Sequence, residues 1–140
     1  MTKDEARKLV QEFFRANDAE SPGLNEQGLG GASLTAGDIF FEYLPEPAAL
    51  KCSALIYRFR GPPNPAVIAA FHDEAKTTDT GGGTLDYETE NRGVYLSRVY
   101  ERALDPETFT AELRKLLDAS QVWRSDAVER VADKAYGRAR

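Results

Sequence analysis

The chain has 140 residues, 41% of them apolar and 29% charged, which is the length and composition of one globular domain with its own core. Eighteen basic and twenty-three acidic side chains give a net charge of −5, which argues against a nucleic-acid-binding module. A single cysteine and a single histidine exclude an internal disulfide and a typical Cys/His zinc site, and no apolar run is long enough to span a bilayer.

The N-terminal segment, residues 1–5, is charged and lacks the apolar run of a signal peptide. We therefore expect a cytoplasmic protein that makes no contact with a membrane or with nucleic acid. The sequence contains no linker, repeat or low-complexity tract, so we expect one domain over residues 1–140, with residues 137–140 frayed.

The first predicted element is a helix that ends near residues 16–17. Thr2 and Glu5 have the spacing of a capping box, and apolar residues then recur on one helical face. After the breaker at residues 21–23, the segment up to Thr35 is rich in glycine. Glycine weakens a strand, so this segment predicts a short strand at the edge of a sheet.

Two stronger strands are predicted at residues 39–44 and 50–59, because both segments are rich in aromatic and β-branched residues. Together they indicate a hairpin. Neither strand alternates cleanly between apolar and polar residues. The apolar side chains expected on the second face of the sheet are Phe40, Leu44, Tyr57 and Phe59.

The second half of the chain predicts a helix, a hairpin and a long final helix. Asn64 and Pro65 indicate the start of the short helix, and strands at residues 84–88 and 94–100 follow it. Asp105 and Pro106 begin the final helix. Its predicted apolar stripe consists of Phe109, Leu113, Leu116, Leu117, Ser120 and Trp123, continued by Val128 and Val131. The fold class is therefore α+β, in the order α-β-β-β-α-β-β-α, with a twisted antiparallel sheet packed by helices.

The sequence offers no convincing catalytic constellation. His72 has acidic neighbours in sequence, but adjacent helical residues do not face each other. Cys52 lies within a strand and is expected to be a small buried side chain. The glycines at residues 81–83 lack the Lys-Ser/Thr of a phosphate-binding loop. We therefore expect no catalytic residue, no metal and no cofactor.

The surplus of apolar side chains is the main functional signal. A small sheet with helices on one face normally has a polar second face, which this sequence does not provide. Either another chain or a ligand covers the extra apolar groups, or the short second helix folds back over them.

Three stretches, residues 83–87, 93–98 and 104–109, together with Trp123, resemble the type III secretion chaperones of the Tir-chaperone-like group. Members show this hairpin with a leucine in its second strand, a leucine-aspartate junction before the last helix, and a late tryptophan. The order of elements matches over essentially the whole chain. The glycine-rich first strand and a final helix that continues past Trp123 depart from the family pattern.

The resemblance implies a homodimer without enzymatic activity that binds an extended segment of a secreted effector protein. The dimer would form through the second helix and the last strands, with Val67, Phe71 and Tyr95 as candidates. The client would bind along the first helix and the first three strands. The residues of this region that the resemblance assigns to the client are Leu34, Phe40, Leu44, Tyr57 and Phe59.

Two other functions remain open at this point. The same fold can serve as an adaptor or regulatory protein-binding module outside any secretion system. A small enzyme or ligand carrier is a third hypothesis, which would require a polar constellation that the sequence does not show.

Overall fold

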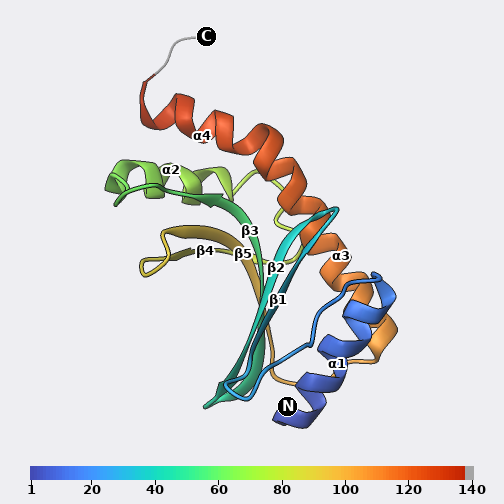
Figure 1. The fold of residues 1–140 in the computed structure, drawn as a ribbon. Coiled ribbons are helices and arrows are strands. Elements are labelled where there is room, and N and C mark those ends of the chain that lie inside the picture. The colour runs from blue at the N-terminus through green and yellow to red at the C-terminus, as the bar shows by residue number, and fades with distance from the viewer. Residues whose placement is uncertain (138–140) are drawn as a thin grey trace.

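In the computed structural model, which describes residues 1–137, one helix precedes three strands, a second helix, two strands and a long helical C-terminus (Figure 1). The elements are α1 (Lys3–Ala16), β1 (Leu29–Leu34), β2 (Gly37–Pro45), β3 (Ala48–Arg58), α2 (Pro65–Glu74), β4 (Thr84–Glu88), β5 (Gly93–Tyr100), α3 (Pro106–Val122) and α4 (Val128–Ala135). A π-helical segment, Trp123–Ala127, joins α3 to α4. The predicted α+β class and element order are confirmed.

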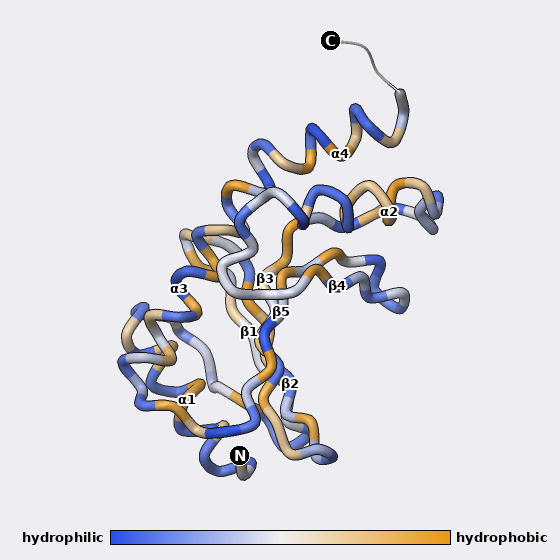
Figure 2. Tube along the Cα trace, turned by 180° about the vertical axis from the view of Figure 1, so that it is seen from behind, coloured by the Kyte–Doolittle hydropathy of each residue, from blue (hydrophilic) through white to orange (hydrophobic). Residues whose placement is uncertain are grey.

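The strands form one antiparallel sheet in the order β1-β2-β3-β5-β4, so β1 and β4 are its two edges. The strands twist strongly, and the helices lie on one side of them (Figures 1 and 2). We call this side, which carries Phe41 and Leu96, the helix face. The opposite side, which carries Phe40 and Tyr95, is the open face.

Local capping signals begin the helices where the sequence predicts. The Thr2 side chain accepts a hydrogen bond from the backbone of Glu5, and the Glu5 carboxylate accepts one from the backbone of Thr2. The side chains of Asn64 and Asp105 each accept a backbone hydrogen bond at the start of α2 and α3, from Ala66 and Thr108, and each is followed by a proline in the first turn. These bonds satisfy backbone donors that the first turn of a helix leaves free.

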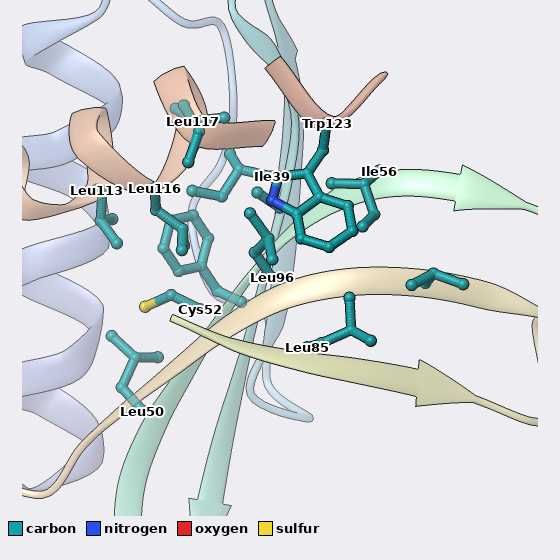
Figure 3. Close-up of a cluster of buried hydrophobic side chains, with 14 of the residues drawn as sticks. Ile39, Leu50, Cys52, Ile56, Leu85, Leu96, Leu113, Leu116, Leu117 and Trp123 are labelled. Carbon is teal, nitrogen blue, oxygen red and sulfur yellow. The ribbon is translucent and has the colours of Figure 1, made fainter. Parts of the chain in front are cut away.

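The core lies between the helix face and α3 (Figure 3). The predicted stripe of the final helix is buried there: Phe109, Leu113, Leu116, Leu117, Ser120 and Trp123. The Trp123 ring stacks on Phe71 of α2 at 6.4 Å, and its indole nitrogen donates a hydrogen bond of 2.9 Å to the carbonyl of Asp79. Trp123 therefore joins α3, α2 and the turn before β4.

Beyond Trp123 the final helix packs on α2. Val131 is buried in this contact. Two ion pairs flank it: Arg130 with Glu74 at 3.0 Å, and Lys134 with Asp73 at 2.6 Å. The extra length of the final helix, which departs from the family pattern, therefore covers the second helix. The predicted fraying at residues 137–140 falls mostly on residues 138–140, which lie outside the described residues.

Replacing Trp123 with Ala should lower the free energy of unfolding by about 3–5 kcal/mol, since a fully buried indole would leave a cavity. Trp123→Phe should cost less, because it mainly loses the hydrogen bond to Asp79. Urea denaturation followed by circular dichroism measures both. Val122→Ala, one residue earlier and exposed, is the control and should change stability by less than about 0.5 kcal/mol. Equal effects at both positions would contradict this account of the core.

Candidate functional site

Apolar side chains stand exposed on the open face. Within residues 1–137, Leu29 of β1, Phe40 of β2 and Val99 of β5 expose 48%, 38% and 54% of their surface. Phe40 also packs edge-on against Tyr95, with ring centroids 6.0 Å apart. The helices are on the other side of the sheet, so nothing in the described chain covers this patch.

The glycines of β1 make room for this arrangement. Gly31 pairs with Phe40 in the sheet, and a Cβ at Gly31 would come within 3.0 Å of the Phe40 ring. A Cβ at Gly30, on the opposite face, would come within 2.8 Å of the carbonyl of Gly23. The glycine-rich strand therefore allows close packing on both sides, with the Phe40 ring on one and the preceding loop on the other.

A hollow of about 510 Å³ lies beside Phe40 on the open face. Leu29, Phe40 and Tyr95 form its apolar part. Its charged lining consists of Lys51, Arg58, Glu42, Glu88 and Glu90. The Arg58 guanidinium donates a hydrogen bond to the Tyr95 hydroxyl at 3.1 Å, which fixes the inner wall. An apolar floor with a charged rim suits a polypeptide segment better than a small polar substrate.

On the open face, Lys51 of β3 forms ion pairs with two residues of β4, across the intervening strand β5. Its ammonium group lies 2.7 Å from a carboxylate oxygen of Asp86 and 3.0 Å from one of Glu88, both on β4. Burial alone would lower the pKa of Lys51, but the hydrogen bonds to the two carboxylates outweigh it, and the pKa is raised. Lys51 is therefore charged at neutral pH and holds two acidic side chains in place.

The outer edge of β1 is only partly covered. Asn25 bonds both backbone groups of Leu29, and the hydroxyl of Ser21 bonds the carbonyl of Gly31. By the alternation of the strand, Ser33 turns its backbone groups to the same edge. Within the described residues, no hydrogen bond reaches those groups. The end of β1 nearest Leu34 is therefore open to a further strand.

The five side chains predicted for a client fall in three places. Phe40 and Leu44 lie on the open face, as expected. Tyr57 and Phe59 lie instead beside α2, where both rings contact Phe71. The register of β3 against β5 shifts after Leu55, and this shift turns Tyr57 towards the helix face.

Leu34, the remaining client candidate, ends β1 on the helix face and lines a second hollow beside Leu117 of α3. The second helix therefore covers some of the extra apolar side chains, which is one of the two explanations that the sequence left open for them. It lies over Phe59 and leaves Tyr57 40% exposed, but does not reach Phe40.

The three dimer candidates are buried within one chain. Val67, Phe71 and Tyr95 are each at most 5% exposed. Phe71 lies under Trp123, and Tyr95 lies under Phe40 and Arg58. These side chains therefore support the fold of the chain and offer little free surface to a second copy.

Leu29 and Val99 were not predicted as site residues. The sequence signal that could have identified Leu29 is its position as an isolated leucine in a polar, glycine-rich segment. Val99 is one of several apolar residues in its strand, and only the pairing of β5 with Lys51 of β3 places it on the open face.

The chemically reactive candidates are not arranged for catalysis. Cys52 is fully buried, and burial raises the pKa of its thiol well above the ordinary value. His72 is exposed on α2. Gly81 packs so tightly against α3 that a Cβ would lie 2.5 Å from the carbonyl of Lys115, so the glycine turn serves packing. Residues 1–137 contain no cluster of side chains suited to hold a metal ion.

None of the helices in residues 1–137 is both long enough and apolar enough to cross a membrane.

No family model matches the chain, and no curated protein matches its sequence. Solved structures do match its fold. A chain in the crystal structure of the ExsC-ExsE complex is 19% identical with a TM-score of 0.65, over 87% of this chain and 92% of that one. A chain in the HopA1-SchA chaperone-effector complex is 14% identical with a TM-score of 0.62, over 87% and 94%.

The chain has a type III secretion chaperone-like fold. The likeness extends over most of both chains in each comparison, so it includes the sheet and the helices around it. The fold expected from the hairpin, the leucine-aspartate junction and Trp123 is confirmed. At these identities the comparison establishes the fold, and the role has to be argued from the surface.

The Cys52 thiol should be unreactive in the folded protein. Its burial and raised pKa predict that Ellman's reagent at pH 8 modifies this thiol in the native protein at least about a hundredfold more slowly than in the protein unfolded in urea. The increase in absorbance at 412 nm, which the released product of the reagent causes, measures the rate of modification. Fast labelling of the native protein would show that the thiol is accessible and would reopen a chemical role.

Proposed function

We propose that this protein is a cytoplasmic, non-enzymatic chaperone that binds an extended segment of a secreted effector protein and keeps that segment unfolded. The observation that carries the proposal is the uncovered apolar patch around Phe40, on a sheet whose helices all lie on the other face. The likeness of the fold to chains in chaperone-effector complexes supports it.

The patch suits an extended chain for a physical reason. Alternate side chains of an extended segment point the same way, so they can insert one after another into an apolar hollow. Phe40 and Leu29 line such a hollow on neighbouring strands. Burial of apolar groups stabilises the complex by about 25 cal/mol for each Å², which must exceed the entropy that the client loses on ordering.

The uncovered end of β1 supports the same client. Strand pairing there uses backbone groups and so does not depend on the sequence of the client. The backbone of Ser33 faces this edge, whereas Asn25 and Ser21 close the other end. A bound strand would therefore begin near Leu34 and run along only part of β1.

We also propose that the protein acts as a homodimer. The three candidates named from the sequence are buried, so the contact would use other surface in the same region. The second edge of the sheet, β4, receives no hydrogen bond from outside the sheet within residues 1–137. An unpaired edge of this kind can pair with a second copy.

Replacing Phe40 with Ser should weaken capture of a client by about tenfold or more, as loss of a central aromatic contact does. The measurement is co-expression with the N-terminal segment of an exported protein encoded nearby, followed by copurification and hydrogen exchange of the captured segment. Tyr136→Ser, which removes another exposed aromatic ring far along the chain, is the control. Equal capture by both variants would refute the role of the open face.

A dimer predicts a mass of twice 15.5 kDa by light scattering at micromolar concentration. Hydrogen exchange should then show protection of the outer amides of β4 that increases with protein concentration, with no such change at β1. A mass of 15.5 kDa at about 100 μM would reject the homodimer and leave the client-binding proposal standing.

A further inference from the structure

One side chain of the final helix reaches across to the sheet. Arg124 lies in the π-helical segment that joins α3 to α4, and its guanidinium donates a hydrogen bond of 2.9 Å to the carbonyl of Ala36 in the β1–β2 turn. It also donates to the hydroxyl of Ser120 at 3.3 Å and, over a longer distance of 3.4 Å, to the carbonyl of Leu55 in β3. Arg124 therefore joins the final helix to the β1–β2 turn and to β3.

The β1–β2 turn lies beyond the rest of the sheet. β1 and β2 pair as far as Leu34 and Gly37. The pairing of β2 with β3, by contrast, begins only at Ile39 and Ala54. Residues 33–38 therefore have no support from β3, and we call them the hairpin tip. Figure 1 shows this tip beside the final helix, where α3 passes into α4.

The hairpin tip has few other attachments. Leu34 and Ala36 pack against the core but are only partly buried. Within residues 1–137, the bond from Arg124 to Ala36 is the one hydrogen bond that joins the tip to an element other than β1 and β2. The position of the tip therefore depends on Arg124.

The glycine at the start of β2 leaves room for the guanidinium. A Cβ at Gly37 would lie 2.5 Å from Nη1 of Arg124 and 3.2 Å from its Cζ. Gly37 also has a φ of 144°, a region that residues with a side chain rarely adopt. A side chain at position 37 would therefore displace Arg124 from the tip.

The acceptors of Arg124 in the described chain are two backbone carbonyls and a hydroxyl, all of them neutral. A guanidinium carries five N–H donors in one rigid plane, so it can bond carbonyls of two segments and fix their separation. The helix is irregular at the same place, because the amide of Val128 bonds the carbonyl of Trp123, five residues earlier. Such π-helical turns often lie at functional positions.

We infer that Arg124 is a positioning residue for the client: it holds the hairpin tip in one place, so that the free backbone edge of Ser33 is ready to pair with an added strand. The inference rests on the proposed function for the existence of a client. It adds a residue of the final helix that acts through Ala36. An edge that is already ordered loses less conformational entropy when a strand is added to it.

A positioning role has a kinetic signature that a direct contact lacks. When Arg124 is replaced and the tip moves, only the fraction of molecules with the tip in place can bind, so association slows in proportion to that fraction. The bound client then holds the tip itself, so dissociation keeps its original rate. Loss of a direct contact, as in Phe40→Ser, acts mainly on dissociation.

Stopped-flow fluorescence measures both rates, with the fluorescein-labelled N-terminal segment of the exported protein encoded nearby as the probe. Arg124→Ala should slow association about fivefold and change the dissociation rate by less than about twofold. Arg124→Lys keeps the charge and one donor group and should recover part of the loss. The control is Arg130→Ala, which removes the same charge from the same helix together with an ion pair to Glu74, and should leave both rates unchanged.

Nuclear magnetic relaxation of the amide nitrogens provides a second readout, which needs no client. Residues 35–38 should have order parameters of about 0.85 in the unmodified protein, as a rigid backbone has. Arg124→Ala should lower them below about 0.6 and leave those of β4 unchanged. Arg124 and Arg130 are both exposed, so neither alanine variant should change the helix content measured by circular dichroism.

Equal slowing by Arg124→Ala and Arg130→Ala would assign the effect to net charge and overturn the inference. Unchanged order parameters at the tip, or faster dissociation without slower association, would overturn it too. If Phe40→Ser speeds dissociation and Arg124→Ala changes neither rate, the positioning role is refuted while the client-binding proposal stands. If Arg124→Ala slows association and Phe40→Ser has no effect, the positioning role stands and the open-face proposal fails.

Discussion

The arrangement depends on Trp123, because its contacts join the final helix to α2 and to the turn before β4. The indole stacks on Phe71 of α2, and its nitrogen bonds the carbonyl of Asp79 before β4. The apolar stripe of α3 is buried against the sheet and α1, and α4 packs on α2. No helix of the described chain is left to cover the other face. The exposure of Phe40 is therefore a consequence of how the core is closed.

Features with local causes could be predicted from the sequence. Thr2, Asn64 and Asp105 each bond a backbone group within three residues, so the sequence alone identifies the start of each helix. Phe40 could be placed on the open face because no register shift interrupts the pairing of β2 with β3, so a count of alternating residues from Ile39 holds. How these elements assemble into one fold was predicted from the resemblance, because local signals carry no information about contacts between distant elements.

Features set by contacts between distant segments could not be predicted. A count of alternating residues puts Tyr57 on the same face as Leu55, but the shift of register between them reverses it, and neither glycine nor proline marks the place. Phe71 is buried because Trp123, fifty-two positions later, lies on it. The hollow beside Leu34 joins the end of α1 to α3, about a hundred residues later, and no sequence motif brings Asp18 and Asp118 to the same place.

The open face keeps apolar groups in a state that lowers the stability of the free protein. Phe40 and Leu29 remain in water, whereas the charged Lys51 on the same face is satisfied by two carboxylates of β4. Surfaces left unsatisfied in the free state gain most on binding, since a partner then supplies the missing contacts. The spacing of the apolar residues of a client would therefore be the property by which this face selects it.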